Sequence, residues 1–156
     1  MLDVTGYRYD PVTGLFFNSR GKEIGSYTQK YGRIPVKKTQ VSLSRLAVRL
    51  MTGEWPRGQV DHIDRNTHNN KWDNLRVCSR ADNLKNSSVY MSNKLGIKGV
   101  FKKKFKAGPA YVASIQSDNK RIYLGRFETP EEAGKAYDEA AKTLHKEFAN
   151  LNFKGN

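Results

Sequence analysis

Short runs of hydrophobic residues alternate with polar turns along the first 40 residues, which predicts β-strands. Residues 7–9 and 15–17 flank a polar loop that ends at Gly14, the pattern of a β-hairpin. A further run at residues 31–36 contains Pro35, which lacks a backbone donor, so we expect that strand at a sheet edge. The chain is therefore expected to begin with β-hairpins.

The hydrophobic period changes after residue 42. Apolar residues then recur at the spacing of one helical face, namely at Leu43, Leu46, Ala47 and Leu50. Ser42 can cap the start of this helix, and Gly53 can end it. Arg45 and Arg49 lie on another face, where they either contact phosphate or stay solvated.

A β-β-α unit follows this helix. Residues 59–78 predict two short strands separated by a loop at 64–74 that is rich in asparagine and aspartate. Ser79 and Asp82 have the spacing of a capping box, which predicts a helix that carries Asn83 near its start.

The last third of the chain predicts a second sheet and a long helix. Alternating apolar residues indicate three strands, at 99–105, 110–116 and 120–127, with turns at 106–109 and 117–119. Thr129, Pro130 and Glu132 are typical of a helix start, and small apolar residues mark one face of the helix that follows. We expect this helix to cover one face of the sheet and to leave the charged face open.

These elements predict the α+β class and two domains. Residues 1–88 would form the first domain, in which N-terminal β-hairpins and a helix (1–57) lead into the β-β-α unit (58–88). A polar stretch without a steady period, 89–97, would be a linker. Residues 98–156 would form the second domain, a three-stranded antiparallel sheet packed on one helix.

The composition favours small basic units over one large core. Only 37% of the 156 residues are hydrophobic, and the formal net charge is +13 with a pI of about 9.9. Such an excess of positive charge suits a polyanion, above all nucleic acid and less an anionic membrane.

Several classes of protein are excluded by the residues that the chain lacks. One cysteine, Cys78, permits no internal disulfide and no ordinary structural zinc site within the chain. No apolar run is long enough for a transmembrane helix, and the first residues lack the features of a signal peptide. We therefore expect a cytoplasmic protein that does not enter membranes.

Asp61 and His62 set an acid beside an imidazole at the end of a short apolar run. If the following helix closes over the two strands, the Asn83 amide oxygen and the Asp61 carboxylate would suit a hard divalent cation. The imidazole could then activate water for phosphodiester cleavage. A lone histidine is more often an ordinary buried side chain, but the adjacent acid and the Asn-rich loop favour a phosphodiesterase site.

This stretch resembles the HNH, or ββα-metal, nuclease family, and within it the phage and intron-encoded homing endonucleases. The residues that carry the resemblance are 60–64, Asn74, Leu75, Arg76 and Asn83. The resemblance implies that Asp61 and Asn83 bind the metal, that His62 is the general base and that Asn74 orients it. Asn74 and Asn83 follow His62 by 12 and 21 residues, as in members whose last histidine is replaced by asparagine.

The donor atoms of the implied site favour magnesium or manganese. Family members with two histidine ligands can hold zinc or nickel, whereas Asp61 and Asn83 offer oxygen. Arg76 could contact the substrate phosphate, or its stem could pack at the edge of the core. We expect a structural or neutral role for His68 and a turn at Asp64.

The C-terminal third resembles the plant ethylene-response-factor type of DNA-binding domain. The matching segments are 99–100, 111–115, 123–127, 132–133, 136–141 and 149–153. The resemblance implies a sheet that enters the major groove. The positions implied to contact DNA are Lys98, Phe101, Lys103, Ser114, Gln116, Arg121, Tyr123 and Arg126. Several arginines of the family are replaced here, so we expect a different target sequence.

Together these features predict a site-preferring DNA endonuclease, of the homing type, from a phage or mobile intron. It would need Mg²⁺ or Mn²⁺ and no small-molecule cofactor, and it would act on double-stranded DNA as a monomer rather than a dimer. Arg76 and the eight positions of the C-terminal third would contact the DNA. The alternatives are a DNA-binding regulator with a vestigial nuclease unit and an RNA-binding module.

Overall fold

The computed structural model describes residues 4–25, 31–89, 92–106, 108–118 and 120–153. The chain is of the α+β class, as predicted, and it divides into two compact units, Met1–Asn83 and Leu84–Asn156. The predicted domain limits at residues 88 and 98 stay a prediction. The predicted linker includes residues 90 and 91, and the predicted turns include residues 107 and 119, all outside the described residues.

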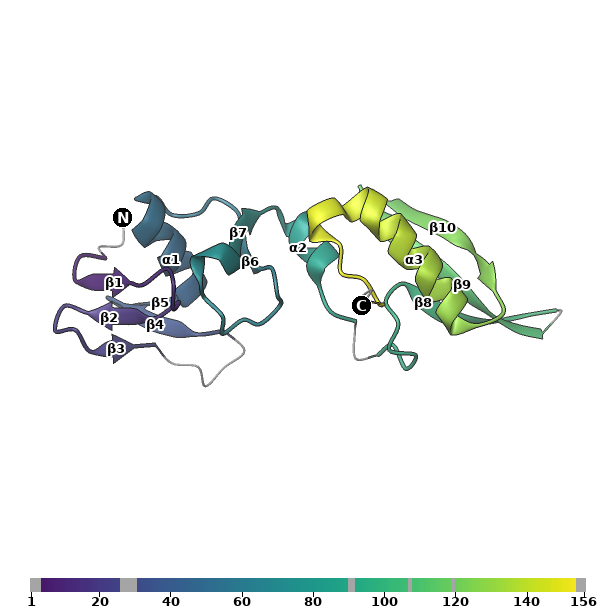
Figure 1. Cartoon of the computed structure of the whole chain (residues 1–156), viewed down its shortest axis with the longest axis horizontal. Helices are drawn as coiled ribbons and strands as arrows, with labels where there is room; N and C mark the ends of the chain where they lie inside the picture. Colours follow the sequence, from purple (N-terminus) through teal and green to yellow (C-terminus); the bar gives the residue numbers. More distant parts are fainter. Residues whose placement is uncertain (1–3, 26–30, 90–91, 107, 119, 154–156) are drawn as a thin grey trace. The chain divides into compact units, whose positions relative to one another are not determined.

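Two small antiparallel sheets begin the first unit (Figure 1). The three-stranded sheet contains β1 (Tyr7–Tyr9), β2 (Phe16–Asn18) and β3 (Glu23–Ile24), so the expected hairpin is confirmed. The second sheet is a hairpin of β4 (Arg33–Val36) and β5 (Thr39–Ser42). Among the described strands, β4 pairs only with β5, as the proline within it led us to expect.

Helix α1 (Leu43–Thr52) packs against these strands. It ends at Gly53, which has φ 79° and donates its N–H to the carbonyl of Arg49, as the sequence predicts. Ser42 precedes the helix but makes no side-chain capping bond. Among the described residues, the core of the unit contains the buried side chains of Tyr9, Phe16, Ile34, Val36, Val41, Leu43, Leu46, Ala47 and Leu75. The apolar face of α1 therefore lies in this core.

The β-β-α unit is also present. Strands β6 (Gln59–His62) and β7 (Leu75–Cys78) form an antiparallel pair, and a 3-10 turn, η1 (Trp72–Asn74), precedes β7. The Ser79 hydroxyl accepts the backbone N–H of Asp82 at the start of α2 (Arg80–Asn86), so the predicted cap is confirmed.

Arg45 of α1, expected either to contact phosphate or to stay solvated, has backbone partners instead. Its guanidinium donates to the backbone carbonyls of Gly58 and Pro56, at 2.8 Å each. The arginine thus ties helix α1 to the segment that enters β6 and acts as a structural residue. Its guanidinium is hydrogen-bonded to backbone carbonyls, as expected for a partly buried polar group.

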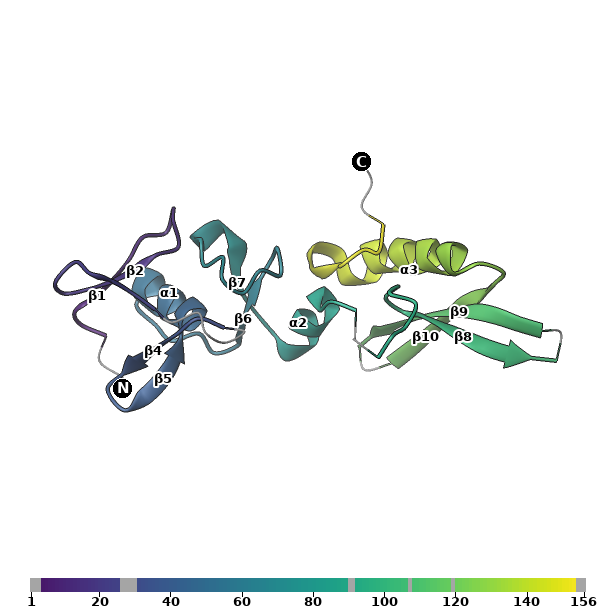
Figure 2. The same cartoon turned by 90° about the horizontal axis from the view of Figure 1, so that it is seen from below.

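The second unit is a sheet with one long helix. Strands β8 (Val100–Phe105), β9 (Gly108–Ser117) and β10 (Lys120–Phe127) are antiparallel, with β9 in the middle. Figure 2 shows α3 (Pro130–His145) lying over one face of this sheet. The predicted capping box at Thr129 is confirmed. Among the described residues, no helix is long and apolar enough to cross a membrane.

Candidate functional site

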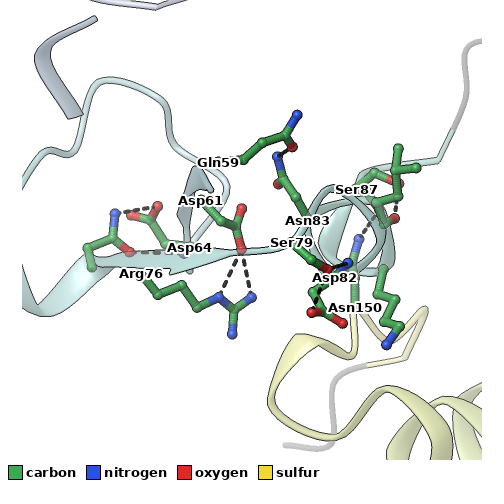
Figure 3. Close-up of polar contacts among 12 residues, drawn as sticks. Gln59, Asp61, Asp64, Arg76, Ser79, Asp82, Asn83, Ser87 and Asn150 are labelled. Carbon is green, nitrogen blue, oxygen red and sulfur yellow. Dashed lines mark hydrogen bonds and ion pairs between the residues drawn. The ribbon is translucent and has the colours of Figure 1, made fainter. Parts of the chain in front are cut away.

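Asp61 comes from β6 and is 6% exposed. Arg76 of β7 lies directly opposite it in the antiparallel ladder, so the two side chains share one face of the hairpin. The guanidinium donates to Oδ2 of Asp61 from Nε at 2.9 Å and from Nη2 at 2.7 Å (Figure 3). The structure thus gives Arg76 a partner that the sequence did not predict, a carboxylate within the site itself.

Asn83 reaches the same face of the hairpin from the first turns of α2. Its Nδ2 atom donates to Oε1 of Gln59 at 2.7 Å (Figure 3). Gln59 and Asp61 are two residues apart in β6, and alternate residues of a strand point to one face. Helix α2 therefore brings the Asn83 amide to the side of the hairpin that carries Asp61.

These two residues fit a hard divalent cation. Each offers an oxygen, and the Gln59 contact occupies the amide nitrogen of Asn83 rather than its oxygen. In the described part of the chain, no group of three His, Cys, Asp or Glu residues could hold a metal ion. Magnesium is commonly held by only one or two carboxylate-type ligands and takes its other ligands from water and substrate phosphate. The donor set therefore suits Mg²⁺ or Mn²⁺ better than zinc.

His62 has surroundings different from those of Asp61. It is the last residue of β6, is 4% exposed, and pairs in register with Leu75, which belongs to the core. Alternation along the strand thus directs the imidazole to the core side. Its Nε2 atom lies 3.1 Å from Oδ1 of Asn70, a residue that the sequence reasoning did not single out. The only signal for Asn70 was its place in the Asn-rich loop.

Asn74, expected to orient the base, organises the loop between the strands. Its Nδ2 atom donates to Oδ1 of Asp64 at 2.9 Å and to the carbonyl of Asn69 at 2.8 Å, and its Oδ1 accepts the N–H of Asp64. Burial raises the pKa of Asp64, but hydrogen bonds from two side-chain amides and one backbone N–H outweigh it and hold that pKa below its ordinary value. Asp64 therefore stays a charged centre of the loop.

Seven of the eight predicted DNA contacts of the second unit share one face of its sheet. Arg121 opposes Gln116, Tyr123 opposes Ser114, and Arg126 opposes Val112, which opposes Phe101. Lys103 follows Phe101 by two residues and lies on the same face. The other face carries Val100, Ala113 and Ile115, which pack in the core beneath α3. The predicted contacts thus form one surface, which we call the open sheet face.

Aromatic rings and cations interleave on the open sheet face. Tyr123 is 63% and Phe101 41% exposed. The Arg126 guanidinium lies 4.3 Å from the centre of the Phe105 ring, and the Lys103 ammonium lies 5.6 Å from it. Ser114, on the middle strand, is only 9% exposed.

Lys98, the eighth predicted contact, does not lie on a strand. It precedes β8, and its ammonium donates to the carbonyls of Lys85 at 2.5 Å and Ser87 at 2.7 Å. The Asn150 amide donates to the same Ser87 carbonyl at 2.9 Å. Lys98 therefore caps the carbonyl end of α2, a role for which basic side chains are suited.

Two comparisons with known proteins bear on the two candidate regions. A segment of 45 residues is 49% identical to the Dehydration-responsive element-binding protein 2A of Arabidopsis thaliana. That segment covers 28% of this chain, and the chain spans only 13% of the plant protein. The match is consistent with the resemblance of the C-terminal third to plant DNA-binding domains. Residues 26–85, which include Asp61, His62, Asn74 and Asn83, match the family model of the HNH endonucleases and so carry a domain that supports a nuclease-type function.

Proposed function

We propose that this chain is a metal-dependent HNH endonuclease that nicks double-stranded DNA at a preferred site, as homing endonucleases do. The observation that carries the proposal is the approach of Asn83 to the hairpin face of Asp61, within a segment that matches the HNH family. Oxygen donors from a strand and a helix, and a histidine that follows one of them in the sequence, are the kinds of group that metal-assisted phosphodiester hydrolysis uses.

Asp61 and Asn83 would hold the cation, Mg²⁺ or Mn²⁺. When bound, that cation supplies positive charge for the scissile phosphate and the departing oxygen. Arg76 keeps the Asp61 carboxylate oriented through its two donated hydrogen bonds. Asn74 maintains the loop between β6 and β7.

His62 acts as the general base. Its imidazole takes a proton from the attacking water while the water oxygen forms a bond to phosphorus. The P–O3′ bond breaks, and the departing 3′-oxygen takes a proton from solvent, which leaves a 5′-phosphate and a 3′-hydroxyl. One site per chain makes a nick in one strand the product of a monomer.

The open sheet face holds the enzyme on its target. A β-ribbon fits the major groove, where arginine reads guanine and other side chains make weaker contacts. Arg121 and Arg126 provide the guanidinium groups of this face, and Tyr123 provides an exposed ring. The net charge of +13 adds general attraction to the phosphate backbone.

The decisive experiment is nicking of supercoiled plasmid in Mg²⁺ or Mn²⁺ by wild type and by His62→Ala. Loss of a general base lowers such rates by about 10²–10⁴-fold. His68→Ala, which removes an exposed histidine of the same loop, is the matched control and should nick like wild type. Equal nicking by His62→Ala and wild type, or no nicking by folded wild type with either metal, would mean that the nuclease proposal is wrong.

Comparison of a DNA duplex with a matched RNA duplex distinguishes the proposed nuclease from an RNA-binding module. The proposal expects cleavage and tighter binding of the DNA duplex, whereas an RNA-binding module would prefer the RNA. Binding of DNA without cleavage under either metal would instead favour a regulator with a vestigial nuclease unit.

A further inference from the structure

Asn70 is one of the most buried polar residues of the first unit. It is 2% exposed, and its amide lies against the imidazole of His62, with Oδ1 at 3.1 Å from Nε2. A buried amide needs partners for both its oxygen and its nitrogen, because an unpaired polar group in the interior is costly. The partners that Asn70 has therefore fix how it is turned.

The second partner of the amide defines which of its atoms faces His62. Nδ2 of Asn70 donates to the backbone carbonyl of His68 at 3.4 Å. The nitrogen side is thus directed to a carbonyl, and the oxygen side is directed to the imidazole. Because an amide oxygen can only accept, Nε2 of His62 must carry the proton of this hydrogen bond. In the neutral ring the lone pair is then on Nδ1.

The N-terminal hairpin holds Asn70 from the other side. The hydroxyl of Tyr9, in β1, donates to the backbone carbonyl of Asn70 at 2.6 Å. Tyr9 is 9% exposed, and its ring packs on that of Phe16 with 4.8 Å between the centroids. Tyr9 and Asn70 are 61 residues apart in the sequence, so the core of the unit determines where the loop can lie.

Two backbone approaches hold the same segment at the loop between β1 and β2. The N–H of Trp72 donates to the carbonyl of Pro11 at 2.9 Å. Gly14 has φ +78°, and a Cβ atom there would lie 2.8 Å from the carbonyl carbon of Asn70 and 2.7 Å from the nitrogen of Lys71. Only glycine fits that position, since a side chain would be both strained and in collision.

We propose that Asn70 is the positioning residue of His62, and that the hairpin of β1 and β2 belongs to the catalytic apparatus because Tyr9 holds Asn70. Asn70 keeps the imidazole in the Nε2–H tautomer and holds the ring in one orientation. The catalytic part of the inference rests on the proposed nuclease function, whereas the tautomer does not.

The tautomer is measured directly by long-range ¹H–¹⁵N spectra of the metal-free protein labelled with ¹⁵N-histidine. Wild type should show one tautomer at His62, protonated on Nε2. Asn70→Leu keeps the approximate volume but has no acceptor, so the two ring nitrogens should shift toward exchange-averaged values. Asn70→Asp keeps an acceptor and should retain the wild-type pattern. An Nδ1–H tautomer in wild type, or an unchanged spectrum in Asn70→Leu, would overturn the proposal.

The hairpin's part is tested by a matched pair of tyrosine variants. Tyr9→Phe removes the hydroxyl on the Asn70 carbonyl, whereas Tyr7→Phe removes a hydroxyl of the same strand that donates to Pro35. We expect exchange broadening at His62 and a several-fold slower single-turnover nicking rate in Tyr9→Phe only. Equal behaviour of the two variants would exclude a role for the hairpin in catalysis.

Single-turnover nicking at saturating DNA gives the catalytic readout. Loss of an outer partner of a catalytic group typically costs about 10–100-fold, and we expect such a fall in rate for Asn70→Leu with unchanged DNA affinity. A fixed Nε2–H tautomer in a protein that nicks no DNA would remove the proposed nuclease function and leave the positioning role intact. Full nicking by Asn70→Leu would remove the positioning role and leave the nuclease function.

Discussion

At the scale of single residues, the ion pair between Asp61 and Arg76 is the contact of the candidate site that is expected to affect stability most. The side chains of Asp61 and Arg76 are 7% and 16% exposed, so their ion pair is largely shielded from water. Removing one partner of a shielded pair leaves the other charge uncompensated, which costs more than the pair itself contributes. The arginine is therefore expected to matter for both stability and metal binding.

Arg76→Ala should lower the free energy of unfolding by about 2 kcal/mol, because the Asp61 carboxylate loses its cation. Mg²⁺ should recover part of this loss, since it returns positive charge to the same carboxylate. Urea unfolding with and without Mg²⁺ measures both effects, and Arg80→Ala, which removes an exposed arginine of α2, is the control. Equal losses in the two variants would show that the ion pair has no special weight.

Burial of a tyrosine makes the second unit sensitive to alkali. Burial, with a smaller contribution from the charge of Asp138, raises the pKa of Tyr137 to about 12. The folded unit therefore favours the neutral phenol, whose stabilising contribution is complete below pH 10 and is lost between pH 10 and 12. At pH 11 the loss should be about 1 kcal/mol.

Tyr137→Phe should remove this part of the alkaline loss. Urea unfolding at pH 8 and pH 11 compares the variant with wild type and with Tyr123→Phe, which changes an exposed tyrosine of the same unit. A drop in stability between the two pH values that is the same in all three proteins would contradict the prediction.

At the scale of elements, helix α3 is joined to the chain that follows it by one buried carboxylate. Asp138 is 4% exposed and accepts the backbone N–H groups of Asn152 and Phe153, both at 2.8 Å. The Asn152 amide adds a third bond to Asp138 and also pairs with the backbone of Lys98. The segment that leads into β8, helix α3 and the last described segment are thus joined through Asn152 and Asp138.

Asp138→Ala should therefore destabilise the protein by about 3 kcal/mol, because two backbone N–H groups and one side-chain amide lose a buried, charged acceptor. Glu139→Ala is a neighbouring control, since Glu139 makes an exposed pair with Lys142 whose loss should change stability little. Thermal or urea unfolding measures the difference. A cost in Asp138→Ala no larger than that in Glu139→Ala would show that the described network is not what holds the segment.

At the scale of the whole molecule, the candidate nuclease site and the candidate DNA-binding surface belong to different units. The candidate site lies in Met1–Asn83, whereas the open sheet face lies in Leu84–Asn156. A substitution in the first unit should therefore change the cleavage rate and leave site preference unchanged. A substitution on the open sheet face should do the reverse.

Arg121→Ala or Arg126→Ala should weaken binding to the preferred DNA site by about 1–3 kcal/mol and reduce site preference. Non-specific nicking at low salt should continue, because His62 and Asp61 are untouched. Lys135→Ala, on the exposed side of α3, is the control for loss of one positive charge. Binding should be measured at one fixed salt concentration. Unchanged site preference in the arginine variants would exclude the open sheet face as the surface that recognises the target sequence.

The sequence by itself determined the elements and the residue types of the site. Periodicity and caps are local, so helices α1 and α3 and the β-β-α unit were all predicted from neighbours within a few positions. The spacing of Asp61, His62 and Asn83 likewise needed no coordinates. The C-terminal strand pattern already implied one charged face, because alternate residues of a strand share a side.

Only the tertiary structure decided which side chains meet. The Tyr9 hydroxyl bonds a residue 61 positions away, and Arg76 bonds one 15 positions away, so neither partner follows from a local pattern. The same holds for Asn70, which the sequence presented as one of several loop asparagines and which packing turned toward His62. A hydrogen bond requires a distance and a direction, and in a folded chain both are set by the core that brings distant segments together.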